Sequence, residues 1–324
     1  MKKVAFIDGV HLELKTGLEE FGWQCDDLTQ VPKDEIRKNI SDYHGIIIRS
    51  RFPMDEYFLR EADKLEFIAR SGAGMENIDV TYCNYRGITL FNAPEGNRNA
   101  VAEHALGMLL SLFNNLNKGD NEIREGIWDR EFNRGVELDG KVVGIIGYGN
   151  NGKAFAKKLR GFDVRIIAYD KYKTGFGDSF VEEVTLSEIQ NEAEVLSLHV
   201  PETPTTRGMI NKRFISQMNN PFYLVNISRG TVVKTVDIMD SLETGKLIGA
   251  CLDVLEYEKS SFENIFADEE SMPLAFKYVL TSPKVILSPH VAGWTTESYF
   301  KLSKVLLDKI TAHFNLKEKS LSIL

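Results

Sequence analysis

The stretch VVGIIGYGNNGKAFAKKL, residues 142–159, indicates the fold class of this chain. An apolar run ends in closely spaced glycines, and a segment of helical character follows at once. A strand, a glycine turn and a helix in this order are typical of a dinucleotide-binding βα unit. Gly147 permits the tight turn, Gly149 lets the backbone approach a pyrophosphate, and Gly152 lets the helix pack closely on the strand.

Because such glycine patterns also occur in turns that bind nothing, the neighbouring residues decide what this one means. Asp170 ends the next apolar run, at the distance where a carboxylate meets the ribose hydroxyls of a bound dinucleotide. A carboxylate at this position repels the 2′-phosphate of NADP and therefore favours NAD. Lys171 and Lys173 beside it either offset part of that repulsion or are solvated surface charges.

Two groups of short apolar runs alternate with charged segments of helical length, which predicts an open α/β fold with mainly parallel sheets. The first group lies at residues 3–7, 45–50, 65–72 and 88–94. The second group lies at residues 141–149, 164–170, 193–201, 223–230, 247–254 and 284–290. Six strands in the second group are enough for one complete doubly wound sheet.

Two longer segments are predicted to be helices. In residues 97–116 apolar side chains recur at helical spacing, which suits either core packing or a subunit interface. They are Val101, Ala105, Met108, Leu109, Leu112 and Leu116. We expect a homodimer or homotetramer from this helix. Residues 295–314 are predicted to form an amphipathic helix, with Thr295 or Thr296 as its N-cap.

The length and composition predict a folded, two-domain protein. The chain has 324 residues, 43% of them hydrophobic and 27% charged. Its net charge of -8 argues against nucleic acid as a partner, because a nucleic-acid binder needs a concentrated basic face.

Localisation follows from the cysteines and the apolar runs. The three cysteines show no pairing or metal-binding spacing, which predicts no metal and a reducing, cytoplasmic location. The apolar run after the N-terminus is too short for a signal peptide, and no run is long enough for a membrane span.

Residues with acid–base chemistry follow the later strands, at the sheet edge where ligands of α/β folds bind. Arg229 offers a guanidinium that can clamp a carboxylate, or forms a structural ion pair. His290 follows the last strand, and Glu256 and Glu258 follow the strand before it. A carboxylate beside an imidazole suits proton transfer to a developing alkoxide, as in a keto-acid reductase. A hydrolase based on serine is disfavoured because the chain has no GxSxG turn.

Eight pieces of the chain, in order, resemble the D-2-hydroxyacid dehydrogenases. They are RSRF, ARSGAGMENIDV, NAPEGNRNAVAEHALG, ELDGKVVGIIGYGNNG, HVPETPTTRGMI, VNISRGTVV, LDVLEYE and SPHVAGWT. The resemblance implies two Rossmann-like doubly wound parallel-sheet domains and an NAD-dependent oxidation of a 2-hydroxy acid to a 2-keto acid. An NAD-binding domain, residues 95–293, would be inserted into a flavodoxin-like substrate domain, residues 1–94 and 294–324.

The resemblance also implies roles for individual residues. Arg229 would bind the substrate carboxylate and carbonyl, His290 would be the acid/base, and Glu258, in preference to Glu256, its partner. Asp253 would lie near the nicotinamide. The cofactor would contact Gly147, Gly149, Asn150, Asn151, Gly152, Asp170, His199, Pro201, Thr206, Ile227, Ser228, Asp253 and Gly293. The substrate would contact Arg49, Ser50, Arg51, Ala73 and Gly74, the last two through backbone amides.

Within the family, Arg49-Ser50-Arg51 resembles the phosphate-facing segment of 3-phosphoglycerate dehydrogenases. This predicts oxidation of 3-phosphoglycerate to 3-phosphohydroxypyruvate, which leads into serine biosynthesis. An unphosphorylated 2-keto acid, as in D-lactate, hydroxypyruvate or glyoxylate enzymes, is the alternative. A third possibility is an NAD-sensing protein without activity, similar to the corepressors of this family.

Three departures from the phosphoglycerate pattern stand out. Asn150 and Asn151 replace the basic residue that is frequent there, and Trp294 is expected to narrow the substrate space. Residues 259–289 are longer than in compact members, and the chain leaves no room for a regulatory domain after its last helix, so control by serine through such a domain is not expected.

Overall fold

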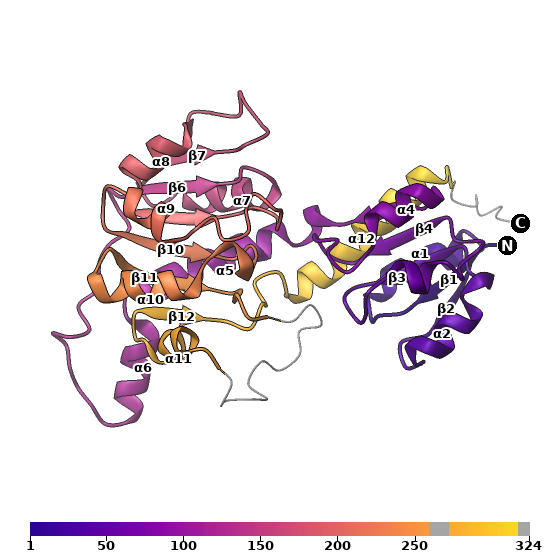
Figure 1. The fold of residues 1–324 in the computed structure, drawn as a ribbon, viewed down its shortest axis with the longest axis horizontal. Helices are drawn as coiled ribbons and strands as arrows, with labels where there is room; N and C mark the ends of the chain where they lie inside the picture. Colours follow the sequence, from indigo (N-terminus) through magenta and orange to yellow (C-terminus); the bar gives the residue numbers. More distant parts are fainter. Residues whose placement is uncertain (259–271, 317–324) are drawn as a thin grey trace, which may run out of the picture. The chain divides into compact units, whose positions relative to one another are not determined.

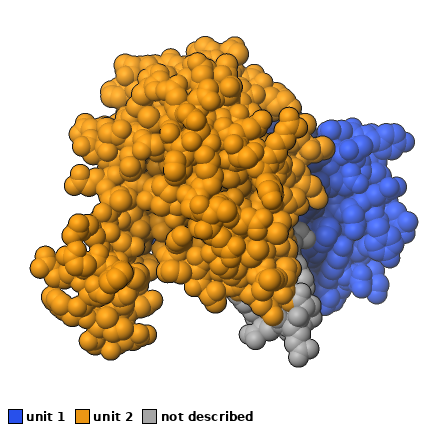
Figure 2. All heavy atoms as spheres, turned by 60° about the vertical axis from the view of Figure 1, so that its left-hand side comes forward, with its two compact units in different colours: residues 1–97, 259–263, 294–324 blue, residues 98–258, 264–293 orange. Residues whose placement is uncertain are grey.

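The computed structural model describes residues 1–258 and 272–316. Contacts within the chain divide it into two compact units, which Figure 2 shows in different colours. Unit 1 contains residues 1–97 and the chain from Trp294 onward, and unit 2 contains the described residues from Arg98 to Gly293. The sequence predicted the first boundary at 94/95 and the second at 293/294. Part of the long segment 259–289, up to residue 271, lies outside the described residues.

Unit 1 is built on a parallel sheet of five strands in the order β2-β1-β3-β4-β5 (Figure 1). The strands are β1 (Lys3–Phe6), β2 (Gln24–Asp27), β3 (Gly45–Ile48), β4 (Phe67–Arg70) and β5 (Thr89–Asn92). This order is that of the flavodoxin-like fold, as predicted. The sequence missed β2, because its residues QCDD are polar and it pairs with β1 alone at the edge of the sheet.

Helices cover both faces of the sheet in unit 1. They are α1 (Leu12–Glu20), α2 (Lys33–Asn39), the 3-10 turn η1 (Ile40–Asp42), α3 (Glu56–Leu59), α4 (Val80–Arg86) and α12 (Thr296–His313). α1 and α12 bury one apolar face, and α2, α3 and α4 bury the other. α12 confirms the helix predicted at residues 295–314, with Thr295 as its N-cap: the Thr295 side chain accepts a hydrogen bond from the amide of Ser298.

Unit 2 is built on a parallel sheet of seven strands in the order β12-β11-β10-β9-β6-β7-β8 (Figure 1). The strands are β6 (Val142–Ile146), β7 (Arg165–Tyr169), β8 (Val181–Glu183), β9 (Val195–Leu198), β10 (Phe222–Asn226), β11 (Leu247–Leu252) and β12 (Val285–Leu287). The order reverses next to β6, as in a Rossmann fold. Six of these strands were predicted; β8, a short edge strand with the sequence VEE, was not.

The helices of unit 2, apart from the projecting α6, form its two outer layers. They are α5 (Pro94–Phe113), which begins in unit 1, α6 (Leu116–Arg124), α7 (Asn150–Leu159), α8 (Leu186–Glu192), α9 (Lys212–Gln217), the 3-10 turn η2 (Gly230–Val232), α10 (Thr235–Thr244) and α11 (Leu274–Thr281). α5 and α7 pack on one face, and α8, α10 and α11 pack on the other. None of the helices in residues 1–258 and 272–316 is long and apolar enough to cross a membrane.

The apolar helix expected at residues 97–116 ends at Phe113, and its apolar face is used inside unit 2. Val101, Ala105 and Met108 are among the residues that it buries in the core. α6 and the segment after it, residues 116–136, project from the rest of unit 2 (Figure 1). We call this projection the arm. It exposes several large apolar side chains, namely Leu116, Ile123, Ile127, Trp128, Phe132 and Val136.

Candidate active site

The glycine turn between β6 and α7 requires glycine at two positions. Gly147 has φ of 94°, and a Cβ on it would lie 2.5 Å from the carbonyl oxygen of His199. A Cβ on Gly152 would lie 2.1 Å from the carbonyl oxygen of Gly147. A Cβ on Gly149 would meet no atom within 4 Å, so the space beside this residue is open. The turn thus has the tight bend, the close packing and the open approach that a dinucleotide site needs.

The start of α7 presents backbone amides that have no partner among the described residues. Within the described residues, the N–H groups of Gly149, Asn150, Asn151 and Gly152 donate to no acceptor. The side-chain Oδ1 of Asn151 is buried and also has no partner there. Because a helix N-terminus carries a partial positive charge, this place suits an anion such as a pyrophosphate.

Asp170 is fixed beside the glycine turn. Its Oδ2 accepts a hydrogen bond from the amide of Tyr148 (2.8 Å), and its Oδ1 accepts from the amides of Tyr172 (2.9 Å) and Lys173 (3.1 Å). The ammonium groups of the two lysines are directed to other loops: Lys173 to the Tyr148 carbonyl (3.4 Å) and Lys171 to Oγ1 of Thr205 (3.3 Å). Three backbone amides therefore hold the carboxylate beside the glycine turn.

His199 follows β9 at the same edge of the sheet. Its Nε2 lies 2.8 Å from Oγ of Ser197, and its Nδ1 is buried without a partner in the described chain. Burial lowers the pKa of His199 to about 3, so the imidazole is neutral near pH 7. In the loop after it, Thr206 Oγ1 donates to the carbonyl of Pro201 (2.6 Å), which closes the loop on itself.

The residues after β10 are tightly held. Ile227 is buried, and Ser228 Oγ donates to Oδ1 of Asn226 (2.9 Å). Arg229 follows, and its Nη1 donates to the carbonyl of Ser228 (2.7 Å). Gly293, the last cofactor residue implied by the resemblance, is also the last residue of unit 2.

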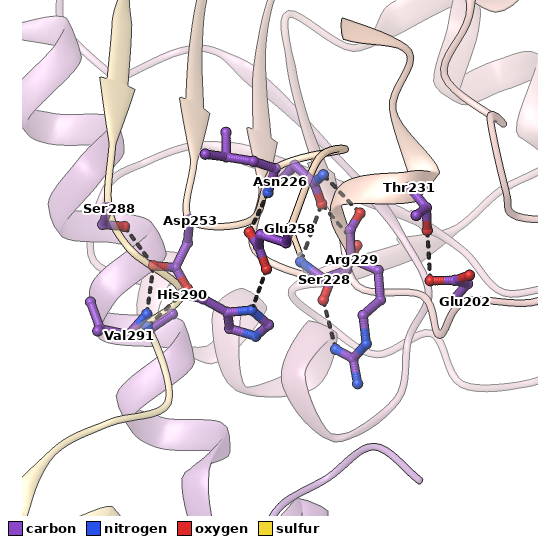
Figure 3. A network of polar contacts seen from close by, with 12 residues as sticks. Glu202, Asn226, Ser228, Arg229, Thr231, Asp253, Glu258, Ser288, His290 and Val291 are labelled. Atoms are coloured by element: carbon purple, nitrogen blue, oxygen red, sulfur yellow. Dashed lines mark hydrogen bonds and ion pairs between the residues drawn. The ribbon is translucent and has the colours of Figure 1, made fainter. Parts of the chain in front are cut away.

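Arg229, Glu258 and His290 follow the neighbouring strands β10, β11 and β12. Nδ1 of His290 lies 2.7 Å from Oε2 of Glu258, and Figure 3 shows the imidazole and the Arg229 guanidinium on the same side of this network. A carboxylate only accepts hydrogen bonds, so Nδ1 of His290 carries the hydrogen and Nε2 is the nitrogen that can exchange a proton.

Glu256, the competitor for this position, is engaged elsewhere. Its carboxylate contacts the ammonium group of Lys234 (2.7 Å) and the amide of Thr235 (2.8 Å). These hydrogen bonds hold the pKa of Glu256 below its ordinary value although burial opposes them. The tertiary structure therefore places Glu258, and not Glu256, against His290.

Asp253 lies under the turn that carries His290. It is 1% exposed, and it accepts hydrogen bonds from Ser288 Oγ (2.6 Å) and from the amides of Val291 and Ala292 (both 2.9 Å). Burial alone would raise the pKa of Asp253, but the nearby His104 and the hydrogen bonds from Ser288 and the two amides lower it below its ordinary value. Both carboxylate oxygens thus accept hydrogen bonds from the turn that carries His290, in addition to any contact with a nicotinamide.

In unit 1, the segment 49–51 follows β3, and its backbone amides are already occupied. The N–H groups of Arg49, Ser50 and Arg51 all donate to Oδ2 of Asp8, at 2.6, 2.9 and 3.1 Å. Asp8 follows β1, which is the neighbour of β3 in the sheet. The sequence did not single out Asp8, although an acidic residue directly after a strand was a usable signal.

The Arg51 side chain, which the sequence predicted to bind substrate phosphate, makes hydrogen bonds within unit 1. Its Nη1 donates to the carbonyls of Ile7 (3.2 Å) and Leu28 (2.9 Å), and its Nη2 donates to that of Val31 (2.9 Å). The guanidinium is committed to three backbone carbonyls because the loop after β2 folds over it. Arg51 therefore holds this loop in place, and a contact with substrate phosphate stays a prediction.

Arg49 has a different environment. Its guanidinium carbon lies 4.0 Å from the ring centroid of Trp294, and burial lowers the pKa of Arg49 from its ordinary value. Arg70, at the end of the neighbouring strand β4, donates from Nε to the Arg49 carbonyl (3.1 Å). The sequence missed Arg70. Arg49 and Arg70 together form a basic pair at this edge of unit 1.

Ala73 and Gly74 lie in the turn after β4. Within the described residues their N–H groups donate to no acceptor, while the Ala73 carbonyl accepts from Nδ2 of Asn92 (2.7 Å). The turn is therefore anchored through its carbonyl and keeps two amides that a carboxylate can use.

Comparison with known proteins identifies the chain's relatives. Residues 106–292 match the family model described as D-isomer specific 2-hydroxyacid dehydrogenase, NAD binding domain. The chain is 30% identical to a D-3-phosphoglycerate dehydrogenase of Archaeoglobus fulgidus, covering 94% of the chain and 53% of that relative. It is 32% identical to a hydroxypyruvate reductase of Thermotoga maritima, covering 86% of the chain and 87% of that relative.

Solved structures show the same likeness. The crystal structure of D-lactate dehydrogenase from Aquifex aeolicus, complexed with NAD and lactic acid, has a TM-score of 0.79 and 26% identity, covering 97% of this chain and 96% of that one. The chain spans about half the length of the first phosphoglycerate dehydrogenases that it matches.

Proposed function

Because the chain belongs to the D-isomer specific 2-hydroxyacid dehydrogenase family, we propose that it interconverts a D-2-hydroxy acid and the corresponding 2-keto acid with NAD. The observation that carries this proposal is the pair formed by His290 and Glu258, 2.7 Å apart, on the sheet that also carries the glycine turn. An oriented imidazole can transfer the substrate proton while a dinucleotide bound at the glycine turn takes the hydride, as a hydride-transfer enzyme requires.

NAD would be held by the amides at the start of α7, by Asp170 and by the loops after β9 and β10. When bound, it supplies the hydride acceptor. His290 takes the hydroxyl proton of the substrate at Nε2, and Glu258 stabilises the positive charge that the ring then carries. In the reverse direction His290 returns this proton to the carbonyl oxygen. Arg229 binds the substrate carboxylate and polarises the reacting carbonyl.

The first candidate substrate is 3-phosphoglycerate, which would be oxidised to 3-phosphohydroxypyruvate in serine biosynthesis. The names of several relatives support it. Arg49 is kept as a side chain proposed to bind the phosphate, and Arg70 takes the place of Arg51 beside it, because two guanidinium groups at one sheet edge suit a dianion. The amides of Ala73 and Gly74 are proposed to bind the substrate carboxylate.

An unphosphorylated 2-keto acid, such as hydroxypyruvate, is the second candidate. The observation that favours it is Asp8, whose carboxylate occupies the amides of residues 49–51 and would repel a phosphate there. A hydroxypyruvate reductase of comparable length among the relatives supports it as well.

A panel of 2-keto acids assayed by NADH oxidation separates the two candidates. We expect turnover with at least one of phosphohydroxypyruvate, hydroxypyruvate, pyruvate, phenylpyruvate and glyoxylate. A kcat/KM for phosphohydroxypyruvate no higher than for the others would exclude the phosphoglycerate assignment. No turnover with any of them, despite tight NADH binding, would contradict the proposed activity and favour an NAD-sensing protein.

One histidine variant and two glutamate variants, one of them a control, test the acid/base pair. We expect His290→Ala to lower kcat by about 100- to 10,000-fold, the usual contribution of a general acid or base, while NADH binding is retained. Glu258→Gln should lower kcat as well, because the charge that stabilises the protonated ring is lost. Glu256→Gln is the matched control and should leave kcat unchanged, since Glu256 contacts Lys234. Equal losses in both glutamate variants would contradict the assignment.

We also infer a homodimer or homotetramer, now from the arm and not from α5. Trp128 and Phe132 are 80% and 79% exposed, and apolar groups gathered on one projection are typical of an association surface. Sedimentation of a Trp128→Glu/Phe132→Glu variant should show monomers where the native chain shows oligomers. Tyr85→Glu, which changes an exposed aromatic residue of unit 1, is the control.

A further inference from the structure

The turn after β12 is wrapped around a single buried carboxylate. Ser288 begins the turn and donates from Oγ to Asp253 Oδ1 at 2.6 Å. The amide of Val291 donates to the same oxygen, and the amide of Ala292 donates to Oδ2 (Figure 3). The amide of His290 donates to the main-chain carbonyl of Asp253 at 2.8 Å. Four groups of this turn are therefore held by Asp253.

His290 has an unusual backbone conformation that needs such support. Its φ is 55°, in the left-handed region that L-residues with a Cβ adopt at a cost. The other non-glycine residues with positive φ, among those that the structure describes, are Asn115, Asp163 and Asn315. Asparagine and aspartate tolerate this region because their side chains can bond locally. His290 instead depends on the bonds that surround its turn.

The hydrogen bonds around Asp253 have one consistent direction. An ionised carboxylate only accepts hydrogen bonds, so the Ser288 hydroxyl donates its one hydrogen to Asp253. Toward any further partner, the hydroxyl oxygen of Ser288 can then act only as an acceptor. Nε2 of His104 lies 2.8 Å from this oxygen and 3.5 Å from Oδ1 of Asp253. His104 therefore carries its hydrogen on Nε2 and donates it to Ser288. The result is a chain of hydrogen bonds from His104 through Ser288 to Asp253.

This chain joins two parts of unit 2 that are far apart in the sequence. His104 lies on α5, in the first turns after the polypeptide enters unit 2 at Arg98. Ser288 lies shortly before the polypeptide leaves unit 2 at Gly293. The backbone that presents His290 is thus braced against a helix buried in the core of the same unit.

We propose that His104 and Ser288 are positioning residues, which hold His290 in its proton-transfer orientation through the carboxylate of Asp253. The inference rests on the acid/base role proposed above for His290. Neither residue needs to touch substrate or cofactor. His104 orients the Ser288 hydroxyl, the hydroxyl completes the set of donors around Asp253, and Asp253 holds the backbone of the turn.

Steady-state kinetics of three variants test this. We expect Ser288→Ala and His104→Leu each to lower kcat by about 10- to 100-fold, because a small displacement of a catalytic group has effects of this size. KM for the 2-keto acid and the dissociation constant of NADH should change by less than about threefold, since binding groups are untouched. His104→Gln keeps an N–H donor near the position of Nε2 and should recover most of the activity.

The matched control is Ser216→Ala, which removes a serine hydroxyl that donates to the Arg213 carbonyl on the surface of unit 2. Titration with NADH counts the folded sites in every preparation, so kcat is expressed per site. If His104→Leu does not fold, Ser288→Ala carries the test, because it deletes one atom and leaves Asp253 in place.

Three results would overturn the inference. They are a kcat of Ser288→Ala equal to that of the native chain, equal losses in His104→Leu and His104→Gln, or a loss confined to KM. An inactive native chain would instead refute the proposed function, so the two failures are distinguishable.

Discussion

Two turns in this molecule follow strands and bring several backbone amides close together. They differ in whether an acceptor from the described chain pairs with these amides. At the start of α7 in unit 2, the amides of residues 149–152 have no acceptor within the described chain. At residues 49–51 in unit 1, all three amides donate to the carboxylate of Asp8. One turn keeps its amides open among the described residues, and the other is closed by a carboxylate of the protein.

The difference shows that converging amides do not by themselves make a binding site. An anion stabilises such a turn whether it belongs to a ligand or to a side chain. When a side chain supplies it, the turn is rigid and satisfied, and a ligand must rely on the remaining groups. In unit 1 these are the side chains of Arg49 and Arg70, because Arg51 holds the carbonyls of Ile7, Leu28 and Val31.

Arg51→Ala is expected to give the largest effect. It removes three hydrogen bonds from a charged donor, so the free energy of unfolding should fall by about 3 kcal/mol, while KM for the substrate is retained. Urea unfolding and steady-state kinetics measure the two quantities. Arg60→Ala is the control, because the exposed Arg60 side chain contacts Glu61 and the ring of Tyr57 at the surface, where such contacts stabilise little. A raised KM with unchanged stability would show that Arg51 binds substrate after all.

Gly149→Ala tests the open turn. A Cβ at this position meets no protein atom, so the melting temperature without ligand should stay close to that of the native chain. It would enter the space proposed for the pyrophosphate, and the dissociation constant of NADH should rise by about 10- to 100-fold, or about 1.4 to 2.7 kcal/mol.

Isothermal titration with NADH measures this change. Gly161→Ala, where a Cβ also meets nothing, is the control outside the turn and should bind NADH like the native chain. Unchanged NADH binding in Gly149→Ala would mean that the open amides are not the pyrophosphate site, and the contrast between the two turns would lose its functional meaning.

Asp8→Asn is expected to give the smallest effect. The variant keeps the shape of the side chain but removes its charge, so the free energy of unfolding should fall by about 1 kcal/mol. If phosphohydroxypyruvate is a substrate, its KM should fall, because a repulsive charge beside residues 49–51 is gone. Asp42→Asn, at an exposed ion pair with Lys64, is the control. A native-like stability would show that Asp8 does not hold the turn.

Most of the fold could be predicted from the sequence because buried parallel strands are continuous apolar runs. The two missed strands, β2 and β8, lie at sheet edges, where polar residues are tolerated and the apolar pattern is lost. The helix predicted at residues 97–116 was correct in kind. Of the two roles considered for its apolar side chains, the structure shows core packing in unit 2, and the exposed large apolar side chains lie in the arm.

The site could be predicted less completely. The glycine turn, Asp170 and the residues after β10, β11 and β12 were identified by local signals: glycine spacing and polar residues at strand ends. Asp8, Arg70, His104 and Ser288 were missed, because each acts through a partner in another element. The contact between Arg49 and Asp8 spans 41 positions, and that between His104 and Ser288 spans 184.

The sequence by itself determined the family, the parallel α/β architecture and the positions at which chemistry is to be expected. These properties depend on short-range patterns in the sequence, such as the spacing of apolar residues and the positions of glycines. Only the tertiary structure decided that Glu258 faces His290, that Asp8 closes the turn of residues 49–51 and that Arg51 donates to three backbone carbonyls. Hydrogen bonds are directional and short, so their partners are chosen by the packing of whole elements and not by separation along the chain.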